Sequence, residues 1–302
     1  MMEAARFQGV GPALVTPMKP DGSVDMDAFS HHVGYMLDGG VDFLVPCGTT
    51  GESATLTAAE QRAVIRRCVE LASGRAPVLA GAGSNSTRTA VELARAAADA
   101  GADGVLVVTP YYNKPTLEGL VLHYGAVAEA GLPIIFYNVP GRTGLNVPPE
   151  AILEIARRVP RVQGVKESSG SVDPLMTLVR DAPEGFQVLC GDDHLGLAAV
   201  ALGAQGLVSV VANETPARIT AVVHRAAAGQ LVEARELHYR LLPLMRANFM
   251  ESNPGPVKAA LALMGRMGDH LRRPLAPVRA ETRAALKGAL EELGALHPQE
   301  HA

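Results

Sequence analysis

The feature that most constrains the fold is a regular alternation of short apolar runs with longer helical segments. Eight runs rich in β-branched or apolar residues each lead into a stretch rich in Gly, Thr, Asn or Pro. They span residues 10–16, 43–46, 77–80, 104–109, 133–137, 162–166, 187–190 and 206–210. Segments with helical periodicity, such as 57–73 and 86–100, separate them. A strand repeatedly followed by a helix indicates a parallel sheet, and eight repeats predict an α/β fold of the (β/α)8 TIM-barrel type.

A doubly wound open sheet alternates in the same way and is the structural rival. No GxGxxG follows the first apolar run, which weakens that alternative. Ser86 can cap the helix that follows it, and Gly101 stands where a helix end favours glycine.

After the eighth run, the chain changes to helical patterns alone. Residues 216–229 are typical of the helix that closes the barrel. Three more helices are predicted at residues 231–250, 254–265 and 277–293. We therefore expect a catalytic barrel over residues 1–229 and a C-terminal three-helix extension, residues 230–302, that packs on it.

The composition argues against several classes of protein. The chain has 302 residues, of which 48% are hydrophobic, enough for a sizeable core. A net charge of −4, the lack of Trp and an aromatic content of 4% disfavour nucleic-acid binding, which usually needs a basic surplus and stacking side chains. No apolar run is long enough for a transmembrane helix, so we expect no membrane contact.

Two further observations concern location. The first ten residues lack the apolar core and cleavage site of a signal peptide. The three cysteines, Cys47, Cys68 and Cys190, are widely spaced and form no CxxC pair. We therefore expect neither a disulfide framework nor a zinc finger, and a cytoplasmic location.

The polar residues after each strand decide the chemistry, because the catalytic groups of such barrels lie at the C-terminal ends of the strands. Lys166 is the sharpest signal, since it ends the sixth apolar run and its place in the barrel implies partial burial. Burial disfavours the ammonium form and lowers a lysine pKa, and a neutral amine beside a carbonyl compound can form a Schiff base. The alternative is a strand-end lysine that reaches solvent or pairs with Glu167.

Three loops carry further candidate groups. The sequence GTTGES (48–53) can form an anion-binding nest at the start of a helix, or it can be an ordinary glycine turn with capping threonines. Tyr112 and Tyr137 can relay protons through their phenol groups, or they can be packing residues. Arg142 lies in a loop constrained by Pro and Gly, where a fixed guanidinium suits a carboxylate; the alternative is a solvated surface arginine.

The sequence Asp192-Asp193-His194 is a candidate metal site, since two carboxylates and an imidazole at a barrel mouth can hold a divalent ion. Consecutive residues seldom converge on one ion, however, and no other His stands in the matching loops. We therefore expect no metal and no other cofactor. Cys47 and Cys190 are interpreted as small buried apolar residues.

Six motifs occur in order between residues 48 and 258, within a resemblance that covers about residues 7–290, nearly the whole chain. They are GTTGES (48–53), VTPYYNKP (108–115), YNVPGRTG (137–144), GVKESSG (164–170), GDD (191–193) and NPGPVK (253–258). As a set they resemble the dihydrodipicolinate synthase/N-acetylneuraminate lyase family. The resemblance implies a (β/α)8 barrel with a C-terminal helical extension, Schiff-base chemistry on pyruvate, and a homotetramer built as a dimer of dimers.

The same resemblance implies roles for individual residues. Lys166 would form the imine with pyruvate, and Tyr137 would move protons as the imine and enamine form. Thr49 would link Tyr137 to Tyr112, a residue that in this family reaches in from the neighbouring subunit. The implied substrate contacts are Thr49 and Thr50 at the pyruvate carboxylate, Arg142 at the carboxylate of the second substrate, and Gly191 and Val208 in the pyruvate pocket.

Within the family, the GRTG sequence around Arg142 resembles the branch that condenses pyruvate with L-aspartate 4-semialdehyde to 4-hydroxy-tetrahydrodipicolinate, on the way to diaminopimelate and lysine. Two alternatives stay open. One is a related pyruvate-dependent aldolase that uses another aldehyde, such as a 4-hydroxy-2-oxoglutarate aldolase. The other is a non-catalytic barrel that binds pyruvate or an amino acid, which the joint presence of Lys166, Tyr137, Thr49 and Arg142 disfavours.

The resemblance also implies a cleft at a subunit interface where lysine binds as an effector. The positions that match lysine-sensitive members are Ser53, Asn85 and Tyr111. Ala58 and Gln61 stand where such members commonly place His, and Thr89 stands where they place a Glu that pairs with an ammonium group of the effector. Because a buried unpaired charge is costly, we predict a chain that is insensitive or only weakly sensitive to lysine.

Overall fold

The computed structural model describes residues 7–296 of the chain. Seven parallel strands form one sheet in the order β1-β7-β6-β5-β4-β3-β2. The strands are β1 (Gly9–Pro12), β2 (Leu79–Gly81), β3 (Gly104–Val108), β4 (Ile134–Asn138), β5 (Val162–Glu167), β6 (Gln187–Cys190) and β7 (Gly206–Ser209). Each overlaps one of the predicted runs, so the prediction of a parallel α/β fold is confirmed.

The second predicted run does not form a regular strand, but it closes the ring between β1 and β2. Val45 bridges to Ala13, and Leu44 bridges to Val78, both in parallel orientation. The run stays short because Cys47 adopts a left-handed backbone conformation, with φ of 56°, and turns the chain into the glycine-rich loop. The result is a (β/α)8 barrel in which one strand is reduced to two bridges.

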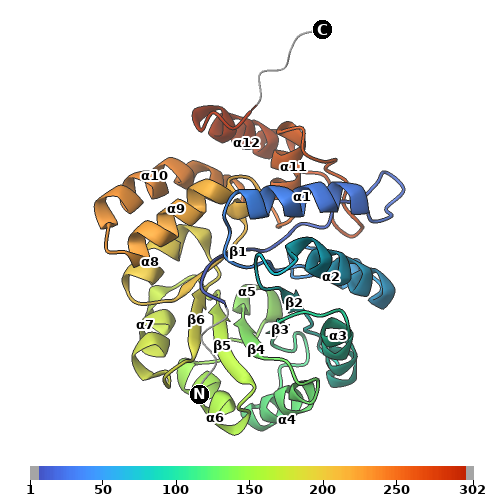
Figure 1. Cartoon of the computed structure of the whole chain (residues 1–302), viewed down its shortest axis with the longest axis vertical. Helices are drawn as coiled ribbons and strands as arrows, with labels where there is room; N and C mark the ends of the chain where they lie inside the picture. Colours follow the sequence, from blue (N-terminus) through green and yellow to red (C-terminus); the bar gives the residue numbers. More distant parts are fainter. Residues whose placement is uncertain (1–6, 297–302) are drawn as a thin grey trace.

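Helices cover the outside of the barrel (Figure 1). Nine of them precede the predicted extension: α1 (Met26–Asp38), α2 (Ala58–Ala72), α3 (Thr87–Asp99), α4 (Leu117–Ala128), α5 (Pro140–Thr143), α6 (Pro149–Arg158), α7 (Val172–Asp181), α8 (Gly196–Ala201) and α9 (Pro216–Ala227). The predicted ends of α3 are confirmed. The Ser86 side chain accepts a hydrogen bond from the Thr89 N–H, and Gly101 follows the helix with φ of 86°.

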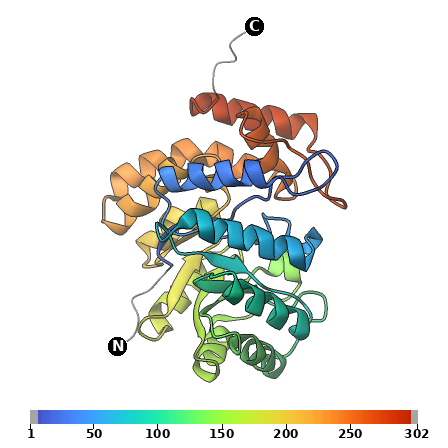
Figure 2. The same cartoon turned by 45° about the vertical axis from the view of Figure 1, so that its right-hand side comes forward.

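Three helices follow in the predicted extension: α10 (Leu231–Ala247), α11 (Gly255–Leu263) and α12 (Ala280–Glu292). Helix α10 packs on α8 and α9, and α12 packs on both α10 and α11. Figures 1 and 2 show these helices, coloured orange to red, gathered at one end of the molecule. Across residues 7–296, no helix combines the length and the apolar character that crossing a membrane requires.

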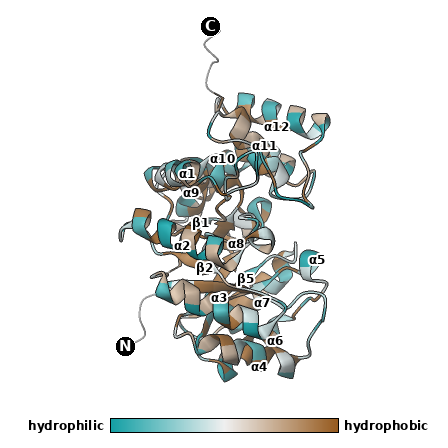
Figure 3. Ribbon diagram, turned by 90° about the vertical axis from the view of Figure 1, so that its right-hand side faces the viewer, coloured by the Kyte–Doolittle hydropathy of each residue, from teal (hydrophilic) through white to brown (hydrophobic). Residues whose placement is uncertain are grey.

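Two apolar layers hold the barrel together, one between strands and helices and one inside the ring of strands. Figure 3 shows apolar strands at the centre and polar surfaces on the outward faces of the helices. The inner layer consists of Phe7, Ala13, Phe43, Val45, Leu79, Leu106, Ile135, Tyr137, Val139, Leu189 and Val208. Because these side chains fill the interior, the space left for a ligand lies at the strand ends.

Candidate active site

A cavity of about 60 Å³ lies at the C-terminal ends of the barrel strands. Six of the eight predicted catalytic and substrate-binding residues line it: Thr49, Thr50, Tyr137, Arg142, Lys166 and Gly191. They lie on or directly after β4, β5, β6 and the reduced second run, and they are far apart in the sequence. The fold therefore brings these six residues into one place.

Lys166 lies on β5 and is only 6% exposed. Its amine is 4.1 Å from the centre of the Tyr137 ring, because Tyr137 on β4 pairs in register with Lys166. The carboxylate of Glu167 accepts hydrogen bonds from the Asn138 side chain and the Ser169 N–H instead. Lys166 therefore neither reaches solvent nor pairs with its neighbour, and its amine faces the cavity.

Gly191, directly after β6, leaves room for the lysine side chain. A Cβ atom at this position would lie against Ser168 Oγ and 2.6 Å from Lys166 Cε, so a larger residue would displace the lysine. The Ser168 hydroxyl also lines the cavity and has no hydrogen-bond partner within residues 7–296. The sequence interpretation missed Ser168, although it stands two residues after the lysine in the GVKESSG motif.

The glycine-rich loop, residues 48–53, contributes Thr49 and Thr50 to the cavity. The expectation that this loop opens a regular helix is wrong, because it leads into a three-residue 3-10 helix, Ser53–Thr55, and α2 begins later. Backbone N–H groups of residues 51 to 53 donate within the turn itself. In the part of the chain that the structure describes, the N–H groups of Gly48, Thr49 and Thr50 make no such bond, so the loop offers the cavity these backbone donors as well as the threonine hydroxyls.

Arg142 lies on α5, directly after β4, with its side chain exposed at the mouth of the cavity. Its Nη2 donates to the carbonyl oxygen of Asn253 at 3.0 Å. This contact orients the guanidinium and leaves its other donors available to a ligand. The structure thus combines the two sequence interpretations, because Arg142 is both solvated and oriented.

Asn253, in the NPGPVK motif, is a site residue to which the sequence interpretation gave no role. It is 5% exposed and lines the cavity from just before α11. Its Nδ2 donates to Thr50 Oγ1 at 2.9 Å, over a separation of 203 residues. The motif was the available signal, but the contact itself depends on how the extension folds back onto the barrel.

Two predicted residues lie outside the cavity. Tyr112 is 90% exposed and has a left-handed backbone conformation, with φ of 74°. It does not reach the site of its own chain, so a catalytic role for Tyr112 requires a second subunit. Val208 is fully buried in the inner layer of the barrel, whereas Val210 lines the cavity.

A second cavity of about 490 Å³, here called the lateral cleft, shares Thr49 and Arg142 with the first. Five of the six predicted effector positions line it: Ser53, Ala58, Gln61, Thr89 and Tyr111. Asn85, the sixth, follows the lining residue Ser84, and its carbonyl oxygen accepts a hydrogen bond from Asn113. The motif resemblance therefore located residues that lie around one cleft.

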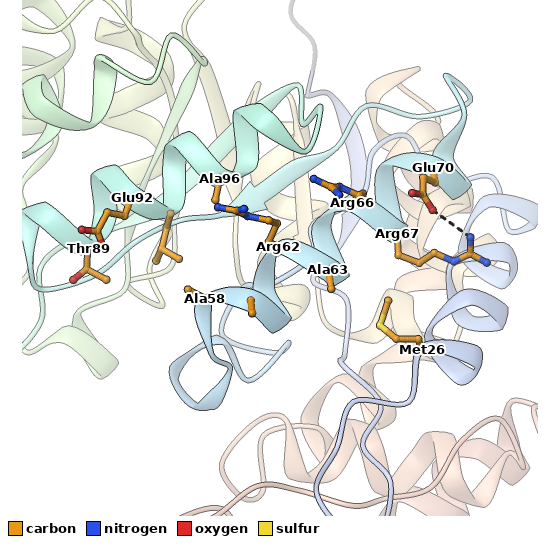
Figure 4. Close-up of a pocket in the computed structure, with 12 residues that line it drawn as sticks. Met26, Ala58, Arg62, Ala63, Arg66, Arg67, Glu70, Thr89, Glu92 and Ala96 are labelled. Carbon is orange, nitrogen blue, oxygen red and sulfur yellow. Dashed lines mark hydrogen bonds and ion pairs between the residues drawn. The ribbon is translucent and has the colours of Figure 1, made fainter.

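The charges around the lateral cleft do not favour a cationic ligand. Glu52 lines the cleft, but Lys258 Nζ and the Arg272 N–H occupy its two oxygens. A groove of about 780 Å³ on the outer surface, between α2 and α3, adjoins the cleft at Ala58 and Thr89 (Figure 4). Three arginines of α2, Arg62, Arg66 and Arg67, line this groove together with Glu70, which pairs with Arg67, and Glu92 of α3.

The candidate metal residues point apart. Asp193 is buried and accepts a hydrogen bond from Ser209 Oγ at 2.6 Å, whereas Asp192 lines the cavity and accepts from the Gly170 N–H at 3.2 Å. His194 is exposed. Burial raises the pKa of both aspartates. Within residues 7–296, no group of three or more His, Cys, Asp or Glu side chains is placed to hold a metal ion.

The three cysteines, Cys47, Cys68 and Cys190, are buried free thiols. Burial raises the pKa of Cys47 and of Cys190 to about 12. These two thiols are therefore neutral at pH 7, which confirms the interpretation of them as small apolar residues.

Comparison with known proteins agrees with this geometry. Residues 6–293 match the model of the dihydrodipicolinate synthetase family. The chain belongs to this family. It is 49% identical over 289 residues to the 4-hydroxy-tetrahydrodipicolinate synthase of Maridesulfovibrio salexigens, a match that covers 95% of this chain and 99% of the relative.

Solved structures of family members share the fold. The dihydrodipicolinate synthase of Acinetobacter baumannii complexed with pyruvate has a TM-score of 0.93 and 41% identity, covering 96% of this chain and 99% of that one. The enzyme of Cyanidioschyzon merolae with lysine bound has a TM-score of 0.92 and 38% identity, with coverage of 96% and 99%. These likenesses confirm the TIM barrel with C-terminal helices that the motifs implied.

Proposed function

We propose that the chain is a 4-hydroxy-tetrahydrodipicolinate synthase, a lyase that condenses pyruvate with L-aspartate 4-semialdehyde. The observation that carries the proposal is the nearly buried amine of Lys166 in a cavity that also holds the hydroxyls of Thr49, Thr50 and Tyr137. Curated relatives that are 47–49% identical over nearly their whole length bear this name. The reaction belongs to the diaminopimelate route of lysine biosynthesis.

Lys166 would act as the nucleophile. Its amine attacks the ketone carbon of pyruvate, and loss of water leaves an imine. Removal of a methyl proton gives an enamine, whose carbon forms a bond to the aldehyde carbon of the second substrate. The amino group of that substrate then adds to the imine carbon, which closes the ring and releases the lysine. Each step moves a proton, and the phenol of Tyr137 can both accept and donate one.

The other site residues would bind the two substrate carboxylates or complete the site from a neighbouring subunit. Thr49 and Thr50 hold the pyruvate carboxylate through their hydroxyl and backbone groups, and Arg142 at the mouth holds the carboxylate of the semialdehyde. Tyr112 is 90% exposed, which supports a role in the active site of a neighbouring subunit. There, Thr49 would link Tyr112 to Tyr137. We accordingly propose a homotetramer, built as a dimer of dimers, that works in the cytoplasm.

A coupled assay tests this function. Pyruvate and L-aspartate 4-semialdehyde are supplied together with a reductase that consumes the cyclic product. We expect reductant consumption that depends on both substrates and on this chain. Cleavage of 4-hydroxy-2-oxoglutarate without the coupled signal would instead indicate an aldolase. Pyruvate binding without turnover of either substrate would indicate a non-catalytic barrel.

A further inference from the structure

Lys258 of the NPGPVK motif reaches from α11 into the glycine-rich loop. Its Nζ is 2.6 Å from Glu52 Oε1, and both side chains are fully buried. The same amine donates to the carbonyl oxygen of Thr16 at 3.0 Å. Because 206 residues separate Glu52 from Lys258, this ion pair connects the C-terminal extension to the mouth of the barrel.

The second oxygen of Glu52 is also occupied. Glu52 Oε2 accepts a hydrogen bond from the Arg272 N–H at 3.0 Å. The guanidinium of Arg272 donates to the Thr55 carbonyl oxygen at 2.8 Å and pairs with Glu60 near the start of α2. Two separate segments of the extension therefore hold the end of the glycine-rich loop and the turn that follows it.

The backbone at Glu52 also needs this support. Its φ of 54° is left-handed, which is uncommon for a residue with a Cβ atom. Such a conformation persists where surrounding contacts enforce it. Glu52 follows Thr50 by two residues, and the carbonyl oxygen of the intervening Gly51 accepts a hydrogen bond from Thr16 Oγ1 at 2.8 Å. The position of Thr50 is thus linked to the position of Glu52.

Stability alone is a weak explanation for this ion pair. Removing two charges from water is costly, and apolar replacements for a buried pair often leave stability unchanged or improve it. Glu52 and Lys258 instead stand directly behind a loop whose Thr49 and Thr50 line the cavity beside Lys166. Their contact fixes the part of the loop that must meet the substrate.

We propose that Glu52 and Lys258 are positioning residues for the reaction. Their buried ion pair holds the glycine-rich loop so that Thr49 and Thr50 meet the carboxylate of the keto acid. This inference rests on the proposed function, because that function assigns the pyruvate carboxylate to Thr49 and Thr50. It gives the C-terminal extension a part in binding pyruvate.

Three variants test the proposal in the full-length enzyme: Lys258→Met, Glu52→Gln and the double variant. Active sites are counted by trapping pyruvate with borohydride, so rates refer to folded enzyme. We expect the KM for pyruvate to rise about tenfold or more in each variant, because a displaced loop weakens the contacts of Thr49 and Thr50 with the pyruvate carboxylate, and about 1.4 kcal/mol of lost binding corresponds to tenfold. The KM for the semialdehyde should change much less. The double variant should regain the Tm that Lys258→Met loses, because it leaves no buried charge without a partner. Its KM for pyruvate should stay raised.

Leu290→Ala is the matched control, since Leu290 is buried in α12 of the same extension and belongs to the apolar core. It should lower the Tm and leave the KM for pyruvate unchanged. A KM that stays normal in Lys258→Met, or that recovers in the double variant together with the Tm, would overturn the positioning role. Wild-type enzyme that pyruvate and borohydride leave unmodified would overturn the proposed function itself, an outcome distinct from either of these.

Discussion

Lys166 and Lys258 are both buried lysines, yet their surroundings differ in kind. Lys258 has a carboxylate at 2.6 Å and a carbonyl oxygen at 3.0 Å. Lys166 has the face of the Tyr137 ring at 4.1 Å and an open cavity. Asp192 lines the same cavity and interacts with this lysine electrostatically, but no acid within residues 7–296 lies at ion-pair distance from Lys166. A buried ammonium needs polar partners to be stable. The comparison indicates that Lys258 is placed to hold the glycine-rich loop and that Lys166 is placed to react.

The largest expected effect comes from replacing each lysine by Met. Lys166→Met should lower kcat by at least about 10³-fold, as for the loss of other covalent nucleophiles, while the Tm stays the same or rises. Lys258→Met should lower the free energy of unfolding by about 3–5 kcal/mol, because it leaves the Glu52 carboxylate buried without its partner. Steady-state kinetics and urea unfolding of both variants measure this contrast. The comparison fails if Lys166→Met unfolds as readily as Lys258→Met.

Arg142→Ala sharpens the comparison by separating imine formation from use of the second substrate. Loss of a hydrogen bond from a charged group costs about 1.5–3 kcal/mol, so the KM for the semialdehyde should rise at least tenfold. Trapping of pyruvate on Lys166 by borohydride should stay at the wild-type rate. Equal damage to both steps would show that Arg142 acts structurally, through its contact with Asn253.

Acid should lower the free energy of unfolding through the buried side chain of His32, which has no acidic partner within residues 7–296. Burial lowers the pKa of His32 from its ordinary 6.5 to about 4, although its Nε2 is hydrogen-bonded to Asn213 Oδ1 at 2.9 Å. Because the folded-state pKa is the lower one, this site contributes stability that is complete above pH 6.5 and is lost as the pH falls toward 4.

The matching variant is His32→Gln, which keeps a side-chain donor toward Asn213. The wild type should lose about 2 kcal/mol more of its free energy of unfolding between pH 7 and pH 4.5 than the variant does. Urea unfolding at both pH values measures this difference. Equal losses would mean that His32 is protonated as easily in the folded chain as in the unfolded one.

The smallest expected effect is that of lysine. Thr89 offers no carboxylate to the lateral cleft, Glu52 is already paired with Lys258, and the neighbouring groove carries Arg62 and Arg66. A missing ion-pair partner that costs about 3 kcal/mol weakens binding more than a hundredfold. We therefore expect at most slight inhibition at millimolar lysine. A half-maximal effect well below that range would mean that Glu92, also in the groove, supplies the missing charge.

Local patterns predicted most of the barrel and the residues that follow its strands. Lys166 could be singled out because an apolar strand ends in a charged residue at the edge where barrels bind ligands. The reduced second strand could not be predicted, since its end depends on the backbone of Cys47. The contacts of Asn253 and Lys258 could not be predicted either. They join parts of the chain more than 200 residues apart, and only the packed extension brings these together.

The most direct test of the contrast between the two lysines is to map which one pyruvate modifies. The enzyme is incubated with pyruvate, reduced with borohydride, digested, and analysed by mass spectrometry. We predict a reduced pyruvate adduct on the peptide that carries Lys166 and an unmodified peptide that carries Lys258. An unmodified Lys166 in enzyme that borohydride and pyruvate have inactivated would contradict the account.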